Sequence, residues 1–462
     1  MNGIIYNSIA GVLTLAILCG LHLMRSVKTA VRGNGMCALA MTAGILITMY
    51  KDHAFGSPVL WAAIAAGMVF GLLLSHTVKM IQMPQLVAFL HGLGGGTAAF
   101  VGFIILLDIG AANAFERANA CLALAAGMIT IAGSFVAAGK LHQLLPQKPF
   151  ILPGHTTLVN ATLALMGAAF VLHTLAPDTL ALPAVFLLLI AGLAFGIIFT
   201  MRVGGADMPI TISLLNSLGG TSSAIAGFAV GDPLLIAIGA IIGSSGFMLT
   251  RIMCRAMNRK LISILLGESA SQGKENTAAA VRFATAASEN PPRDKGVTPA
   301  DMLASARKVI IVPGYGMALA QAQHAVKQFA DKLESRGGKV SYAVHPVAGR
   351  MPGHMNVLLA EANVDYEQLL EMDIVNPMFA EADLVLVVGA NDVINPAAME
   401  AKDTPIYGMP ILRVDEARRV IICNYDDKPG YAGVDNTLYR REGVILLQGD
   451  AAHTLEQLIA MM

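Results

Sequence analysis

Charged residues are scarce in this chain of 462 residues. Asp, Glu, Lys and Arg make up 13% of the sequence, whereas 55% of the residues are hydrophobic. This balance excludes a single ordinary soluble domain, in which about 25% of the residues are charged. The few charges are also unevenly divided: 13 Lys and Arg stand against 6 Asp and Glu up to residue 260, and 18 against 25 after it. The sequence therefore predicts two chemically different parts.

Cysteine motifs are absent. The five cysteines are Cys19, Cys37, Cys121, Cys254 and Cys423; no two of them form a CxxC pair, and four lie in or near apolar runs. This spacing argues against zinc-ribbon and dithiol redox chemistry. We expect reduced, buried cysteines and no metal site.

Long apolar runs dominate the first part. A membrane-spanning helix needs about 20 mostly apolar residues, and nine segments fit, at 4–24, 34–50, 58–76, 83–107, 118–138, 155–176, 180–201, 209–230 and 233–256. Loops after odd-numbered segments carry eleven Lys and Arg, and loops after even-numbered segments carry two. The positive-inside rule then predicts an outside N-terminus and a cytoplasmic second part. The first segment keeps its positive charges behind it, which indicates an uncleaved span rather than a signal peptide.

Four of these segments carry small and polar residues on one helical stripe. In lipid, such stripes mark the faces that pack against other helices. The stripes are Ala88, His91, Gly95, Ala98 and Gly102; Ala120, Ala123, Gly127, Thr130 and Ser134; Ser213, Asn216, Gly220, Ser223 and Gly227; and Gly239, Gly243, Gly246 and Thr250. We expect these four helices to surround one weakly polar seam.

His91 lies in the middle of its segment. Ionisable groups inside a span are costly, and histidine changes charge near neutral pH, so His91 fits a proton relay. A neutral histidine bonded to a neighbouring helix fits equally well. Asn216 is either its partner or a plain interhelical contact, and Asp207, shortly before Pro209, has the position of a helix N-cap.

The second part begins like a nucleotide-binding domain. Residues 308–312 predict a strand, Gly314-Tyr315-Gly316 a turn, 317–336 an amphipathic helix and 339–344 a second strand. Phosphates bind at the N-terminus of such a helix, although Leu319 occupies the third glycine position of the fingerprint. Further strands are predicted at 382–392, 409–414, 419–424 and 443–450.

Strands that alternate with helices indicate a doubly wound parallel sheet, a Rossmann-like α/β domain. The expected organisation is a polytopic helical membrane domain at 1–260, a linker at 261–300 with little to bury, and a nucleotide-binding domain at 301–462.

The second strand lacks the acid that an ordinary NAD site places at its end. It runs into His345-Pro346, and the following loop offers Arg350. An arginine near a missing acid predicts a phosphorylated ribose or a different pose of the cofactor. Only one dinucleotide fold is predicted, so a hydride partner requires a second site elsewhere.

Longer motifs carry a resemblance that covers essentially the whole chain. "PGYGMALAQAQ", "HPVAGRMPGHMNVLLAEA", "GANDVINPAA" and "GYAGVDN", together with "MPQLVAFLHGLGG", "GGADMPITISLLNSLGG" and "GSSG", resemble the β subunit of proton-translocating nicotinamide nucleotide transhydrogenase. The resemblance implies that the second part binds NADP(H) and exchanges hydride with NAD(H) on a separate α subunit, driven by a proton that crosses the membrane half. It also implies an α2β2-type assembly with β–β contact in a bacterial inner membrane, without a nucleic-acid partner.

The resemblance implies roles for individual residues. His91, Asn216 and Asp207 match the proton path and its coupling, and Asp392 matches the acid after the fourth strand. The positions that match the cofactor site are Gly314, Tyr315, Gly316, Met317, Ala318, Leu319 and Ala320; His345, Val347, Ala348, Gly349 and Arg350; Gly389, Ala390, Asn391 and Asp392; Asn424 and Tyr425; and Gly430, Tyr431 and Ala432.

One strand end departs from the family. Where the family has Lys-Arg-Ser to hold the ribose 2′-phosphate, this chain has Asn424-Tyr425-Asp426. Charge-assisted contacts to phosphate are the strong ones. We therefore expect a weakened preference for NADP(H) over NAD(H), unless Lys428 nearby replaces the lost cations.

A nucleotide-gated channel or transporter with a regulatory Rossmann domain is the alternative function. In that interpretation the segment "HGLGGGT" at 91–97 is a filter, although close helix packing explains its glycines more simply. Hydride exchange with an α subunit distinguishes the two functions.

Overall fold

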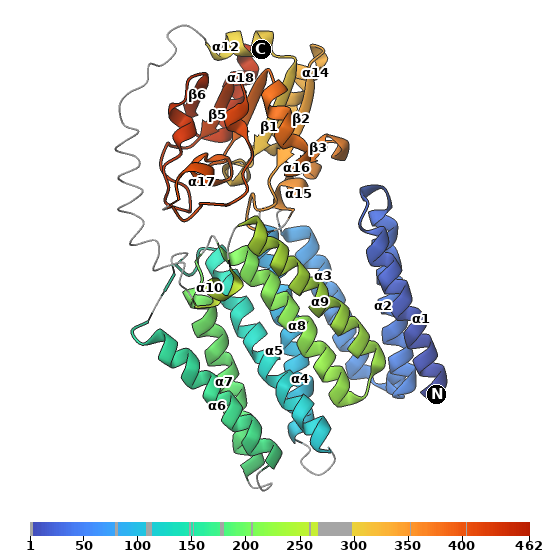
Figure 1. Ribbon diagram of the computed structural model, residues 1–462. Coiled ribbons are helices and arrows are strands. Elements are labelled where there is room, and N and C mark those ends of the chain that lie inside the picture. Colours follow the sequence, from blue (N-terminus) through green and yellow to red (C-terminus); the bar gives the residue numbers. More distant parts are fainter. Residues whose placement is uncertain are drawn as a thin grey trace. The chain divides into compact units, whose positions relative to one another are not determined.

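The structure is a computed structural model that describes residues 3–78, 82–107, 113–146, 149–150, 152–175, 180–204, 207–257, 260–266, 298–351, 353–402 and 404–462 (Figure 1). The chain forms two compact units. The first consists of Met1–Arg202 and Thr211–Leu249, and the second of Val203–Ile210 and Thr250–Met462.

Long helices make up the front of the chain. They are α1 (Gly3–Leu23), α2 (Val27–Lys51), α3 (Pro58–Thr77), α4 (Met83–Leu107), α5 (Ala114–Leu141), α6 (His155–Leu175), α7 (Ala181–Arg202), α8 (Met208–Val230) and α9 (Pro233–Ala256), with a 3-10 turn η1 (Ala54–Gly56) and a short α10 (Leu261–Leu266). Each predicted apolar segment coincides with one long helix. The largest difference is α2, which begins seven residues before the predicted segment and takes Lys28 and Arg32 into its first turns.

Eight of these helices are long and apolar enough to cross a membrane. The exception in the described part of the chain is α8, which has the length but carries Thr211, Ser213, Asn216, Ser217, Thr221, Ser222 and Ser223. Length and composition therefore support eight of the nine predicted spans. The span predicted at 209–230 coincides with α8, whose composition is too polar to support it.

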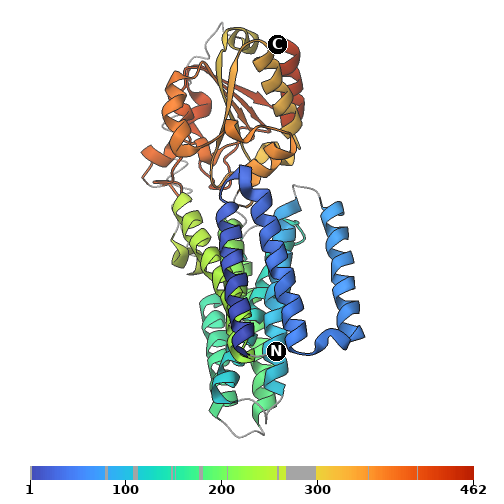
Figure 2. The same cartoon turned by 90° about the vertical axis from the view of Figure 1, so that its right-hand side faces the viewer.

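Glycines set the closest helix contacts, as the stripes predict. In the pairs α4–α5 and α8–α9, a Cβ at Gly95 would lie 2.6 Å from the Thr130 Cβ, and a Cβ at Gly246 would lie 2.9 Å from the Ser217 amide nitrogen. Only glycine allows backbones to approach this closely. The helices α4 and α5, and α6 and α7, lie side by side (Figure 1, Figure 2).

A six-stranded sheet forms the centre of the second unit. All its neighbouring strands are parallel, in the order β3-β2-β1-β4-β5-β6. The strands are β1 (Lys308–Pro313), β2 (Lys339–Val344), β3 (Leu369–Glu371), β4 (Leu384–Val388), β5 (Val420–Asn424) and β6 (Val444–Gln448). This order is that of a dinucleotide-binding fold. Successive strands are added on one side of β1 up to β3 and on its other side from β4 onward, so the strand order reverses between β1 and β4.

Helical segments cover both faces of the sheet. On one face lie α12 (Pro299–Ser305), α13 (Tyr315–Leu319), α14 (Gln323–Ser335), α15 (His354–Glu361) and α18 (Ala451–Met461). The other face carries α16 (Met372–Val375) and the 3-10 turns η6 (Asn376–Glu381), η7 (Asp392–Ile394), η8 (Val414–Glu416) and η9 (Thr437–Arg440), which share one hydrophobic core. The short α17 (Ala397–Glu400) belongs to a separate core cluster, and η5 (Tyr366–Gln368) precedes β3.

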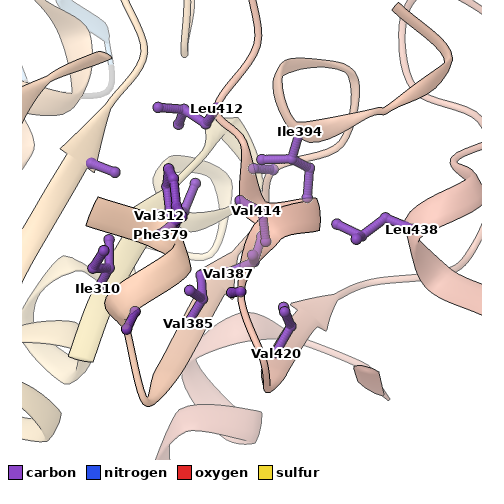
Figure 3. Packing of buried hydrophobic residues seen from close by; sticks show 14 of the residues in the cluster. Ile310, Val312, Phe379, Val385, Val387, Ile394, Leu412, Val414, Val420 and Leu438 are labelled. Atoms are coloured by element: carbon purple, nitrogen blue, oxygen red, sulfur yellow. The ribbon is translucent and has the colours of Figure 1, made fainter. Parts of the chain in front are cut away.

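Alternate residues of the buried strands fill the two cores. Ile310 and Val312 of β1 and Val385 and Val387 of β4 point to the α16 face, where they pack against Phe379 (Figure 3). A parallel sheet covered on both faces requires such continuous apolar strands, which explains why β4 reads as an unbroken apolar run.

Two sequence predictions in this unit are wrong, and one strand is missed. The helix predicted at 317–336 is two helices, because the chain turns at Ala320–Ala322 with Gln321 at φ 51°. The segment 409–414 is not a strand: its Pro410 and Ile411 carbonyls accept hydrogen bonds from His345 and Asn376 side chains. The strand β3, only three residues long, was not predicted.

Candidate functional site

The turns after β1 and β4 meet at the carboxyl edge of the sheet. The Gly316 amide donates to the Gly389 carbonyl and the Gly314 amide to the Val388 carbonyl, both at 2.8 Å. A Cβ at Gly316 would lie 2.6 Å from the Gly389 Cα, so neither position accepts a side chain. Ligands of doubly wound sheets bind at this reversal point, where backbone amides face a phosphate without side chains in the way.

The turn that the sequence predicts as the phosphate site would contact a ligand through its backbone. Gly314 precedes α13, whose Met317 and Ala318 are fully buried, while Leu319 is largely exposed. The two buried side chains fix the turn against the core, and the Met317 amide closes it by donating to the Gly314 carbonyl at 3.2 Å. The chain then reverses at Ala320 before α14.

His345, at the end of β2, belongs to the frame of the site. It is 1% exposed, its Nε2–H donates to the Pro410 carbonyl at 2.8 Å, and its Nδ1 accepts from the Val347 amide at 3.2 Å. Burial lowers the pKa of His345 to about 4, so the ring is neutral. The buried Ala348 continues this turn through its own bond to the His345 carbonyl.

Arg350 is directed at the turn after β1. Its guanidinium carbon lies 4.6 Å from the centre of the Tyr315 ring, a cation–π arrangement. The backbone behind it is fixed, because the Arg350 amide donates to Nδ1 of His354 at 3.0 Å and Gly349 has φ 106°. A Cβ at Gly349 would lie 2.5 Å from that same Nδ1.

Asp392 carries the acid of the loop after β4. Its Oδ2 accepts from the Ala432 amide at 3.1 Å, and Gly430 packs against the carboxyl group. The residue as a whole is partly exposed, but Oδ1 is sealed from solvent. Burial raises the pKa of Asp392 from 3.8 to about 6, against the lowering effect of the Ala432 and Tyr431 amides.

The segment after β5 folds back over this acid. Asn391 donates to the Lys428 carbonyl at 3.0 Å, and Asn436 donates to the Asn391 carbonyl at 3.1 Å. The Tyr431 ring, 58% exposed, lies 6.2 Å from the Tyr315 ring. Residues from the loops after β1, β2, β4 and β5 therefore converge at one edge, as the resemblance implies.

Asn424 and Tyr425 point in opposite directions. Asn424 is 7% exposed and its amide donates to the Ala390 carbonyl at 3.0 Å and to the Tyr439 hydroxyl at 2.7 Å. Tyr425 is 82% exposed. The sequence places both at the ligand, whereas the structure turns the side chain of Asn424 into the domain.

The arrangement fits the common part of a nicotinamide dinucleotide. The glycine turn and the Ala320 reversal suit a pyrophosphate, Arg350 lies beside that turn, and Asp392 with Tyr431 closes the neighbouring loop. This fit does not extend to a ribose 2′-phosphate, because the strand end at Asn424 offers no cation of its own to bind it.

His91 is on α4, next to a packed helix face. Its Nδ1 is buried and has no hydrogen-bond partner among the described residues. The neighbouring Gly92, Gly95 and Gly96 each face α5, at Ser134, Thr130 and Ile131. Glycines used for helix packing do not line a filter, which weighs against the channel interpretation.

Asn216 lies against α9. A Cβ at Gly246 on α9 would lie 3.1 Å from the Asn216 amide nitrogen, whereas the next turn of α8, at Gly219, faces the His91 carbonyl. No His91–Asn216 hydrogen bond exists in the described chain. Asp207 is buried directly before α8 and belongs to the second compact unit.

Sequence reasoning missed His354, Asn436 and Tyr439. His354 is fully buried and accepts the Arg350 amide. Asn436 bonds the loop after β4, and the Tyr439 hydroxyl accepts from Asn424 at the end of β5. The only available signal was the position of His354 inside the quoted motif of residues 345–362. Nothing in the spacing of the other two indicates a long-range contact.

Comparisons with known proteins match the whole chain. The family model described as NAD(P) transhydrogenase beta subunit matches residues 7–461. The protein named NAD(P) transhydrogenase subunit beta from Rhodospirillum rubrum is 42% identical, over 98% of this chain and 97% of its own length. The protein of that name from a designated strain of the same species matches to the same extent.

Proposed function

Since the chain belongs to the NAD(P) transhydrogenase beta subunit family, we propose that it exchanges hydride between nucleotides on its own C-terminal domain and on an α subunit. It is a membrane enzyme that uses nicotinamide nucleotides and has an α subunit as partner. The finer assignment is NAD(H) on the α subunit and, by the resemblance, NADP(H) on this chain.

One observation carries the proposal. The parallel sheet has the order β3-β2-β1-β4-β5-β6, and glycine turns meet at the reversal between β1 and β4. A bound nicotinamide ring supplies hydride chemistry, and the domain supplies binding and orientation. Gly314 and Gly316 carry no side chain that would keep a ligand from the backbone of the turn. Arg350 provides positive charge, and Tyr431 covers the edge of the sheet where the ligand would bind.

We expect Asp392 to link the binding of a nucleotide to the conformation of the rest of the domain. Its carboxyl holds the segment around Ala432, and its pKa of about 6 allows protonation near neutral pH. Loss of the charge weakens a charge-assisted bond to a backbone amide. Protonation therefore loosens the segment that carries Tyr431.

The membrane helices supply the energy source in this proposal. Hydride transfer between two nicotinamides is nearly symmetric, so an external bias is required. One charge that crosses 100 mV supplies about 2.3 kcal/mol, roughly a fifty-fold change in the ratio of nucleotides. His91, Asn216 and Asp207 are the proposed path and coupling residues.

The proposed setting is a bacterial inner membrane, with the N-terminus outside, the nucleotide domain in the cytoplasm and an α2β2-type assembly with β–β contact. Eleven Lys and Arg after odd-numbered spans against two after even-numbered spans support the orientation.

Reconstitution tests the function. The chain, combined with an α subunit in sealed vesicles, should catalyse hydride transfer between the two nucleotide pools and change the internal pH. Each transfer moves one hydride from the C4 position of a reduced nicotinamide to C4 of an oxidised one. Nucleotide-stimulated ion flux without hydride transfer would instead indicate the regulatory channel.

A further inference from the structure

The segment after β5 presents negative charge at the nucleotide edge. Asp426 and Asp427 follow Tyr425, and the next residue, Lys428, is the one cation of residues 425–436. Lys428 Nζ lies 3.3 Å from Oδ2 of Asp426, and the Lys428 amide donates to Oδ1 of the same carboxylate at 3.2 Å. The cation is thus directed at a carboxylate of its own turn.

Asn424 contributes no compensating group to this surface. Its amide is used for the Ala390 carbonyl and the Tyr439 hydroxyl inside the domain. The next side chain, Tyr425, is 82% exposed and offers a flat aromatic face beside the two carboxylates. Such a face suits the stacking of a purine ring, since every base has a π face.

The end of β2 offers neither of the groups that usually bind the ribose: a carboxylate for its 2′-hydroxyl or a cation directed at its 2′-phosphate. His345 is neutral and 1% exposed, with both ring nitrogens used, so it binds neither a hydroxyl nor a phosphate. The guanidinium of Arg350 lies over the Tyr315 ring, beside the glycine turn. Among the described loops after β1, β2, β4 and β5, the acid-plus-aromatic surface at 425–427 is thus the ribose-reading candidate.

We propose that this domain prefers a nicotinamide nucleotide whose ribose 2′-hydroxyl is free, NAD(H), over the 2′-phosphorylated form, with Asp426 accepting ribose hydroxyls and Tyr425 stacking on the adenine. This inference rests on the proposed nucleotide-binding function of the domain and disagrees with NADP(H) as the expected cofactor. A carboxylate accepts the 2′-hydroxyl in NAD sites, whereas NADP sites place an arginine there.

Charge decides the preference. A 2′-phosphate, like other phosphomonoesters, carries about −1.5 to −2 charges at pH 7, and here it would approach two carboxylates. Lys428 is the one local group that opposes this. Its ion pair with Asp426 is exposed and therefore weak, so release of Lys428 toward a phosphate is the specific competing arrangement.

Binding to the full chain in detergent tests the preference. The fluorescence of NADH and of NADPH is titrated at low and moderate salt. We expect NADH to bind about tenfold more tightly or better. Equal or tighter binding of NADPH would overturn the inference and leave the proposed function standing, whereas no binding of either nucleotide would overturn both.

Variants locate the cause. Asp426→Asn should weaken NADH binding several-fold and leave NADPH binding equal or tighter, and Tyr425→Arg should tighten NADPH selectively. Glu381→Gln is the matched control, because Glu381 is an exposed carboxylate before β4, at the opposite edge of the sheet. An unchanged NADH-to-NADPH ratio in Asp426→Asn would overturn the role of Asp426.

The Lys428→Gln variant tests the competing arrangement, in which Lys428 leaves Asp426 and contacts the 2′-phosphate. If Lys428 swings to a 2′-phosphate, the unaltered chain binds NADPH at least as tightly as NADH and Lys428→Gln loses that binding, which would contradict the inference. We expect instead that NADPH binds weakly with or without Lys428 and that NADH binding is retained.

Discussion

The Asp392 carboxylate and the Ala432 amide are joined by a hydrogen bond of 3.1 Å. This bond connects the loop after β4 with the segment after β5, two parts of the chain 40 residues apart. Tyr431 directly precedes Ala432, so this bond holds the backbone beside the Tyr431 ring.

The C-terminal part of the second unit, residues 296–462, should fold without the membrane helices. Residues 296–462 contain all six strands and a core with Val387, Phe379 and Leu455 fully buried. We expect the isolated fragment to unfold cooperatively on heating and to bind a nicotinamide dinucleotide. Circular dichroism and calorimetry check both properties, and a fragment that binds neither NADH nor NADPH would refute the expectation.

Gly389→Ala should disable the nucleotide turn. At φ 67° an alanine is strained, and its Cβ would overlap the backbone of Gly316 and Met317. We expect the fragment to lose about 3 kcal/mol or more of stability and most of its nucleotide affinity. Chemical denaturation and calorimetry measure these losses.

Gly433→Ala is the matched control for that change. Gly433 has nearly the same φ, 69°, but nothing lies within 4 Å of its Cβ position. We expect a cost of about 1 kcal/mol from backbone strain alone. Equal losses in the two variants would show that the contact between the turns has no energetic importance.

Asp392 should make stability depend on pH. The folded pKa is raised from 3.8 to about 6, so the folded domain holds the proton more tightly than the unfolded chain. The stabilisation is present below pH 4 and is lost as the pH rises to about 6, to an extent of about 3 kcal/mol. Unfolding of the fragment at pH 4 to 7 measures it. Burial lowers the pKa of His345 and of His354 to about 4, which gives a slope of the opposite sign, so the Asp392 contribution is the difference between the unaltered fragment and Asp392→Asn. The same pH dependence in both would contradict the prediction.

His91→Asn should separate hydride exchange from proton movement. Asparagine nearly fits the space and retains hydrogen bonding, so we expect folding and nucleotide binding to persist. Nucleotide-driven proton uptake in vesicles should fall to background because asparagine does not titrate. His76→Asn, at an exposed position near the end of α3, is the control and should pump normally. Full pumping by His91→Asn would make His91 a packing residue.

The sequence predicts the architecture well where the pattern is long. Apolar runs of 17 or more residues indicate the helices, because a helix in lipid must carry its own backbone hydrogen bonds. The glycine stripes predict that α4, α5, α8 and α9 pack together, and close glycine contacts do join α4 with α5 and α8 with α9. The strands β4 and β5 are recognisable because they are buried on both faces.

Contacts between distant loops are what the pattern does not reveal. Residues 409–414 alternate like a strand, yet Leu412 bonds to Val393 and the Pro410 carbonyl bonds to His345, so the segment lies outside the sheet. The sequence predicts Asn424 as a ligand residue but does not predict the bonds of its side chain to Ala390 and Tyr439. These partners are 15 to 65 residues away, beyond the reach of local periodicity.

The polar helix α8 has a consequence for how the protein enters the bilayer. Ser217 donates to the Gly243 carbonyl at 2.7 Å and Ser213 to the Gly246 carbonyl at 3.1 Å, so α9 satisfies hydroxyls that lipid cannot. We therefore expect the insertion machinery to release α8 and α9 together, as a helical hairpin. A nascent chain that ends at Val230 should leave α8 outside the lipid, and one that ends after Ala256 should bury it. Integration of α8 by itself would contradict this order of assembly.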